Sequence, residues 1–226
     1  MATSSMTISA TNKATQALTA PRAGAVAGIL FAVLFGTSVV LLRLSVPADS
    51  ADASAWTPSM LNRATLALRL IPYAGIFFLW FVGVIRDRLG AAEDKFFATV
   101  TLGSALVFLA LTLASCAVAG GLLGSLLTGG SQALPLDMYL FARSVIILAF
   151  NTFAVKLASV FMLSLATLWR STGVMPWPLV YLTYLLALVM LAAFSLNLWL
   201  LLIFPAWVLL VSVYILITNL RPKELP

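Results

Sequence analysis

The stretch Ala23–Leu42, AGAVAGILFAVLFGTSVVLL, decides the fold of this chain, because its 20 residues include no charged side chain. An α-helix rises about 1.5 Å per residue, so roughly 20 apolar residues cross the ~30 Å hydrocarbon core of a bilayer. The run is too long for the apolar part of a cleaved signal peptide, which has about 7–15 residues. We therefore predict a retained membrane-spanning helix.

Five more apolar runs follow, and the composition of the whole chain suits lipid rather than water. Of its 226 residues, 62% are hydrophobic and 9% are charged, whereas soluble domains have about 25% charged residues. We predict an all-α, polytopic transmembrane helical bundle over residues 23–220. A disordered cytoplasmic tail (residues 1–22) precedes it and a short cytoplasmic tail (residues 221–226) follows. The six predicted spans are Ala23–Leu42, Ala64–Ile85, Phe96–Leu123, Met138–Trp169, Leu179–Ser195 and Leu198–Thr218.

The boundary between the last two spans is the least marked in the sequence. Leu179–Thr218 is nearly continuous and is twice as long as one span, and the short segment Ser195–Asn197 is its main interruption. A tight helical hairpin of two crossings is the favoured interpretation. The alternative is one merged segment that lies partly in the membrane interface.

Lysine and arginine are distributed unevenly along this pattern, which predicts an orientation. Eight lie in segments on the side of the N-terminus, two lie on the opposite side and three lie within spans. Basic residues concentrate on the cytoplasmic side of membrane proteins. Both termini are then cytoplasmic, in a bacterial inner membrane, and the number of spans is even. The net charge of +6 is explained by this bias and by anionic headgroups, so we expect no nucleic-acid partner.

Small residues form a ridge on one face of the first span, where they recur every four positions. Lipid tails are as apolar as leucine, so membrane helices associate through close packing of small residues. The third span carries a similar series at Ala110, Ala114, Ala117 and Gly121. The favoured interpretation is helix packing within the chain, and docking of another subunit is the alternative. The ridge of the first span consists of Gly24, Gly28, Ala32 and Gly36.

The residues that most membrane enzymes require are missing from the predicted spans. The chain has no histidine, which excludes His-ligated haem, His-type zinc sites and Ser-His catalysis. All seven acidic residues lie outside the spans, which argues against an intramembrane proton relay or an aspartyl intramembrane protease. Asp87 and Asp94 are interleaved with Arg86, Arg88 and Lys95, a pattern typical of a salt-bridged loop. We predict no enzymatic activity, no metal and no cofactor.

Lys156 is the deepest basic residue of the predicted spans. A charge at the centre of a span costs roughly 2.5–3.5 kcal/mol on insertion scales. Thr152, Ser159 and Thr167 lie on the same helix face, which should point into the bundle. The available partners of Lys156 are carbonyls at a helix end, an asparagine amide, water or a bound anion, and burial can also leave the amine neutral.

Four arginines lie near the outer face in this topology. They can pair with Asp49, Asp52 and Asp137 of the outer loops, or they can hold a phosphate or carboxylate headgroup, which suits the forked guanidinium. Together with Lys156 they are the candidate lipid- or anion-binding residues. The four are Arg43, Arg63, Arg69 and Arg143.

Two stretches, PRAGAVAGILF at Pro21–Phe31 and STGVMPWPLVYL at Ser171–Leu182, resemble small multi-span membrane proteins of actinobacteria. Some proteins of that kind look like accessory subunits of larger transporters, including Mce-type lipid importers. The resemblance implies a non-catalytic accessory or assembly subunit of a lipid-related transport complex, with membrane lipids and other membrane subunits as partners. The alternative is a stand-alone small transporter or an anionic-lipid-binding membrane protein. Against a transporter, no internal repeat relates the first three spans to the last three.

Overall fold

The computed structural model describes residues 2–46, 56–89, 95–129, 135–192 and 198–220, and all regular structure in these segments is helical. The α-helices are α1 (Ala2–Ser45), α2 (Pro58–Leu89), α3 (Lys95–Gly129), α4 (Leu136–Ile147), α5 (Val155–Thr172), α6 (Trp177–Ala192) and α7 (Ile203–Leu220). A π-helical segment, η3 (Leu148–Ala154), joins α4 to α5 into one rod, and a 3₁₀ segment, η4 (Leu198–Leu202), precedes α7. The predicted all-α class is confirmed.

The helices follow the predicted apolar runs closely. Five of them, counting the rod as one, are long and apolar enough to cross a membrane, whereas α6 has 16 residues and is shorter. The described part of α6 ends at Ala192, and the predicted hairpin turn at Ser195–Asn197 lies outside the described residues. The predicted tail at residues 221–226 lies outside them as well.

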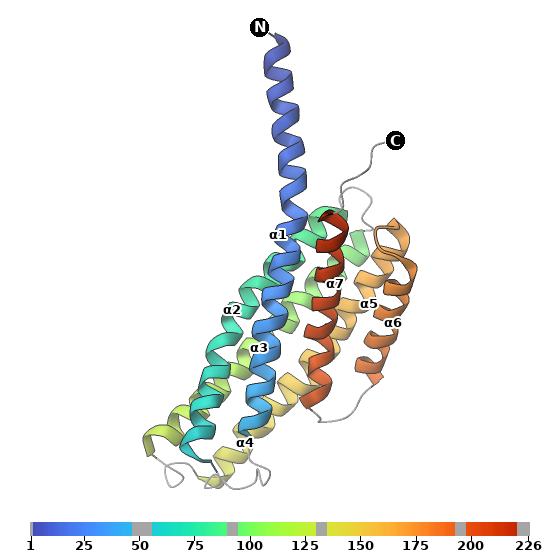
Figure 1. Ribbon diagram of the computed structural model, residues 1–226. Coiled ribbons are helices and arrows are strands. Elements are labelled where there is room, and N and C mark those ends of the chain that lie inside the picture. Colours follow the sequence, from blue (N-terminus) through green and yellow to red (C-terminus); the bar gives the residue numbers. More distant parts are fainter. Residues whose placement is uncertain (1, 47–55, 90–94, 130–134, 193–197, 221–226) are drawn as a thin grey trace.

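The N-terminal segment, predicted as a tail, continues α1 in the structure. Helix α1 begins at Ala2, and its first part projects from the bundle as an extension of the apolar segment that is long enough to cross a membrane (Figure 1). Extending an existing helix avoids the unfavourable nucleation step. Residues 2–20 contain no glycine or proline, the two residues that oppose a helix most strongly.

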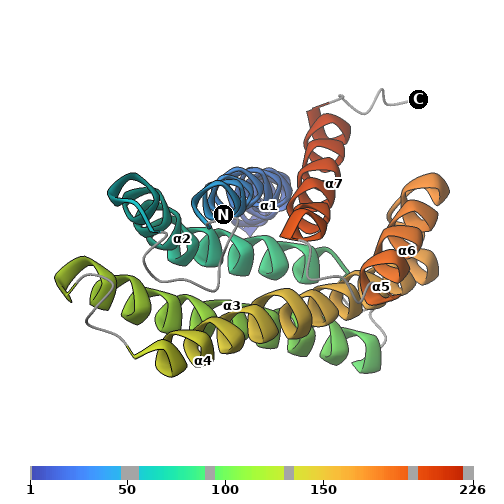
Figure 2. The same cartoon turned by 90° about the horizontal axis from the view of Figure 1, so that it is seen from below.

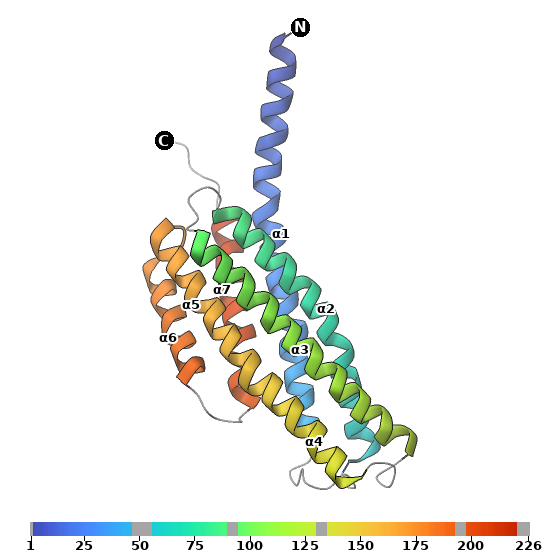
Figure 3. The ribbon, with the colours of Figure 1, turned by 180° about the vertical axis from the view of Figure 1, so that it is seen from behind.

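The helices pack in two layers. In the view along the bundle, α1 lies between α2 and α7, while α3 and the rod of α4, η3 and α5 form the second layer (Figure 2). Seen from behind, α3 follows the rod over most of its length (Figure 3). Helix α6 packs on α5 at the edge of the bundle.

Aromatic side chains fill the middle of the bundle, where both layers meet. The ring centroid of Phe78 on α2 lies 4.9 Å from that of Phe31, 5.5 Å from that of Phe108 and 5.7 Å from that of Phe204. All four side chains are buried. Tilted and edge-to-face rings at these separations attract one another beyond the area that they bury. This cluster joins α1, α2, α3 and α7.

The small-residue ridge of α1 is used within the chain over part of its length. A Cβ atom at Gly24 would lie 2.4 Å from Val84 of α2, and one at Gly28 would lie 2.0 Å from Ser212 Oγ of α7. Ala32 is buried, but a Cβ atom at Gly36 would have no neighbour within 4 Å. Side chains of α2 and α7 therefore occupy the space beside positions 24 and 28, where glycine is required, and not the space beside position 36.

Candidate functional site

A cavity of about 260 Å³ lies at one end of the bundle. We call this end distal; here α1 ends, α2 begins, α3 ends and α4 begins. The opposite end, where α2 and α5 end, is called proximal (Figure 1). The walls of the distal cavity come from α1, α2, α3, α4 and η3, and most of their area is apolar. Representative apolar lining residues are Leu42, Ala64, Leu123, Ile147 and Phe150.

The cavity separates two hydrophobic clusters. The large central cluster reaches it at Phe150, and a smaller cluster at the distal end reaches it at Ala64 and Leu123. A partly open space of this size with mainly apolar walls is a candidate binding site.

Polar groups line one wall of the distal cavity. Arg143 of α4 and Asn151 of η3 are both half-buried and both line it. They are eight residues apart, which is about 12 Å along a helix. The indole Nε1 of Trp56 donates a hydrogen bond to Tyr139 Oη at 3.1 Å, which ties the start of α2 to α4 beside the cavity. A guanidinium at one place and apolar walls elsewhere suit an amphiphile with an anionic head.

The π-helical segment η3 carries both Phe150 and Asn151 into this wall. Such segments are rare in proteins and are frequent at functional sites. Sequence reasoning missed η3, because a π-helix has no clear local signature. The one signal in the sequence is Asn151 itself, a polar residue in an apolar run.

The other predicted arginines do not line the distal cavity. The guanidinium carbon of Arg43 lies 5.9 Å from the ring centroid of Trp199 in η4, a cation–π contact between α1 and the segment before α7. Arg63 and Arg69 are exposed on α2. Of the four arginines predicted near the outer face, Arg143 is the one that the structure places at this cavity.

Lys156 lies against the end of α6. Its Nζ donates hydrogen bonds to the main-chain carbonyl oxygen of Leu191 and, at 3.5 Å, to that of Met190. The last carbonyls of a helix have no partner within the helix, and a cation there is favoured by the helix dipole. The described residues therefore include carbonyl partners of the kind that we predicted for Lys156. Thr167 faces the same helix through a 2.8 Å hydrogen bond to Tyr184 Oη.

Comparisons with known proteins add no assignment to this site. No family model matches the chain, and neither a curated protein nor a solved structure matches it. The resemblance to small actinobacterial membrane proteins therefore stays a prediction. Within the described segments, no group of three histidine, cysteine, aspartate or glutamate side chains is arranged to hold a metal ion.

Proposed function

We propose that this chain is a non-catalytic integral membrane protein of the bacterial inner membrane that binds an anionic amphiphile, such as a phospholipid, in the distal cavity. The observation that carries the proposal is Arg143, a half-buried residue in the wall of a mainly apolar space of about 260 Å³. Lipid tails are as apolar as the wall of the cavity, so the acyl chain would be held by close packing and not by removal from water. A charge-assisted hydrogen bond to Arg143 would fix the position of the head.

The test is lipid retention during purification in a mild detergent, read by mass spectrometry. We expect one anionic phospholipid per wild-type protein. Arg143→Gln should retain at least about tenfold less, because a hydrogen bond to a charged group contributes about 1.5–3 kcal/mol. Arg63→Gln is the matched control, since Arg63 is exposed on α2 and should retain the wild-type amount. Equal retention by both variants would contradict the proposal.

The proposed topology has six spans with both termini in the cytoplasm, so that the distal end faces outward. It is supported by the described basic residues of the proximal end, which belong to the segments that the positive-inside rule places in the cytoplasm. With 16 residues, α6 is about 24 Å long, and we propose that it belongs to the fifth crossing. The exposed basic residues are Arg22, Arg86, Lys95 and Arg170.

Cysteine labelling of intact cells tests this topology. In a Cys116→Ser background, a membrane-impermeant maleimide should label Thr128→Cys, at the exposed distal end of α3, without permeabilisation. Ser171→Cys, exposed at the proximal end, should react only after the cells have been permeabilised. The reverse pattern would place the distal cavity on the cytoplasmic side.

A second candidate function is that of an accessory subunit in a larger, lipid-related transport complex. The favouring observation is the exposure of α3: 22% of the residues in its most apolar stretch are buried, against 44% in that of α1. The small-residue series predicted on this helix, Ala110, Ala114, Ala117 and Gly121, is exposed rather than packed within the chain. In lipid, such a face permits close approach of another helix.

A pull-down from the native membrane separates this candidate from a protein that acts alone. Stoichiometric recovery of a large membrane complex, lost in Ala114→Leu and kept in Leu113→Ala, would support an accessory subunit that docks through α3. Both positions are exposed on α3. Recovery of the wild-type chain alone, with bound lipid, would argue against it.

A further inference from the structure

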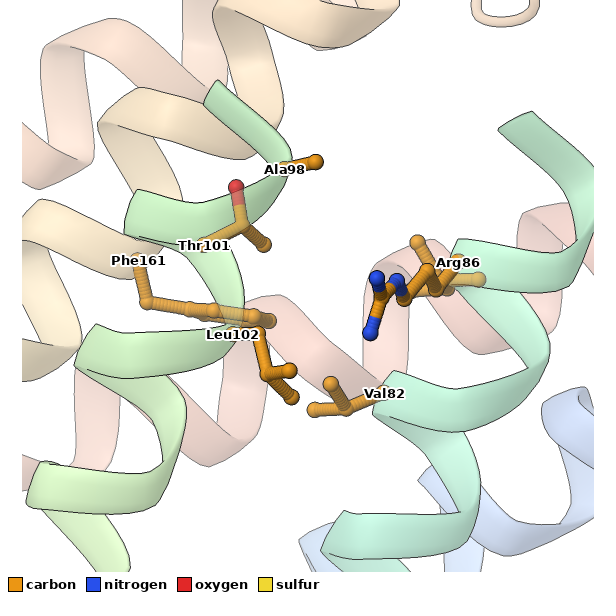
Figure 4. A pocket seen from close by; sticks show the side chains of 7 residues that line it. Val82, Arg86, Ala98, Thr101, Leu102 and Phe161 are labelled. Atoms are coloured by element: carbon orange, nitrogen blue, oxygen red, sulfur yellow. The ribbon is translucent and has the colours of Figure 1, made fainter. Parts of the chain in front are cut away.

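A second, much smaller pocket lies at the proximal end, between α2 and α3 (Figure 4). Its volume is about 10 Å³, close to the smallest space that can hold one water-sized group. Arg86 of α2 extends toward Thr101 of α3 across it, and Val82, Leu102 and Phe161 complete much of the wall. Arg86 is exposed, so a larger molecule can contact it from outside while one atom enters the pocket.

Thr101 is the unusual residue of this pocket. Each of the other described serine and threonine side chains of α3 donates a hydrogen bond to a main-chain carbonyl about one turn earlier; they are Thr99, Ser104, Thr112, Ser115, Ser125 and Thr128. The Thr101 hydroxyl has no hydrogen-bond partner among the described residues, although its side chain is only 7% exposed. Buried polar groups without a partner are rare in native proteins.

The electrostatics of the pocket favour an anion. The Arg86 guanidinium supplies a full positive charge and several N–H donors. The hydroxyl of Thr101 supplies one more donor. An oxygen that accepts hydrogen bonds and carries negative charge suits both groups.

We propose that this pocket binds one oxygen of a phosphate-type anion, held by Arg86 and Thr101, from either an anionic lipid headgroup or free phosphate. The small volume admits a single oxygen, and the rest of the anion stays in the headgroup layer beside Arg86. The site does not depend on the distal cavity. It rests on the proposed topology only for the assignment of the lipid to the cytoplasmic leaflet.

The test measures binding to purified protein in an Arg143→Gln background, so that the distal cavity does not contribute. The probes are a short-chain phosphatidylglycerol, a phosphatidylcholine of the same chain length and inorganic phosphate. Arg86→Gln should raise the dissociation constant for phosphatidylglycerol at least about tenfold, and Thr101→Val about three- to tenfold. The matched controls are Arg170→Gln, exposed at the proximal end, and Thr112→Val, whose hydroxyl bonds within α3. Both control variants should change the dissociation constant for phosphatidylglycerol less than twofold.

The outcomes separate the two sources of the anion. Binding of phosphatidylglycerol that inorganic phosphate does not displace identifies a lipid headgroup, whereas saturable binding of phosphate with the same response to Arg86→Gln identifies the free anion. Equal affinity for phosphatidylglycerol and phosphatidylcholine, or no binding of either anionic probe, overturns the proposal. In that case the Thr101 hydroxyl meets a lone water. If Arg170→Gln weakens the binding of phosphatidylglycerol as much as Arg86→Gln does, the binding reflects general charge attraction. That result would also overturn the proposal.

Discussion

The middle of the bundle and its distal end are made of similar apolar side chains but are packed in different ways. In the middle, Phe78 has ring neighbours from α1, α3, α5 and α7 at centroid separations of 4.9–5.7 Å. At the distal end, a space of about 260 Å³ separates the central cluster from the small cluster around Leu61. The difference indicates that the middle provides the stability of the fold, whereas the distal end is available for a ligand.

The largest effect should come from the aromatic middle. Phe78→Ala is expected to lower the free energy of unfolding by about 3–5 kcal/mol, because it leaves a cavity among rings that cannot collapse into it. Phe141→Ala is the control at the distal end, where the side chain is 70% exposed; it should change stability by less than about 0.5 kcal/mol. Unfolding in mixed micelles with a rising fraction of SDS measures both. Similar losses in the two variants would remove the distinction between the two regions.

The positions of the helices were predictable because an apolar run of sufficient length has few alternatives in a membrane. The particular carbonyl partners of Lys156 could not be predicted, because they depend on where the short helix α6 ends in space. The contacts of the arginines could not be predicted from the sequence either. Arg43 and Arg143 are both distal by sequence, yet one contacts Trp199 and the other lines the cavity. Burial of the α1 ridge and exposure of the α3 series also depend on packing between helices, which spacing along one helix does not determine.

A smaller effect should separate two glycines of the same ridge. Gly28→Ala is expected to cost about 1–3 kcal/mol, because the new Cβ atom would lie 2.7 Å from the Phe81 ring as well as 2.0 Å from Ser212 Oγ. Gly36→Ala introduces the same methyl group into open space and should be neutral or stabilising by up to about 1 kcal/mol, since alanine favours a helix. Thermal unfolding in detergent compares the pair. Equal destabilisation by both would indicate that the ridge packs along its full length.

The smallest expected effect concerns the polar contact that joins α2 to α4 at the distal end. Because packing there is interrupted by the cavity, the hydrogen bond from Trp56 to Tyr139 should hold the wall in place. Trp56→Phe and Tyr139→Phe, alone and combined, form a double-mutant cycle with an expected coupling of about 0.5–1.5 kcal/mol. The single variants should also weaken lipid retention, since they loosen the wall that carries Arg143. A coupling near zero, together with unchanged retention, would mean that the cavity keeps its shape through apolar contacts alone, as the middle of the bundle does.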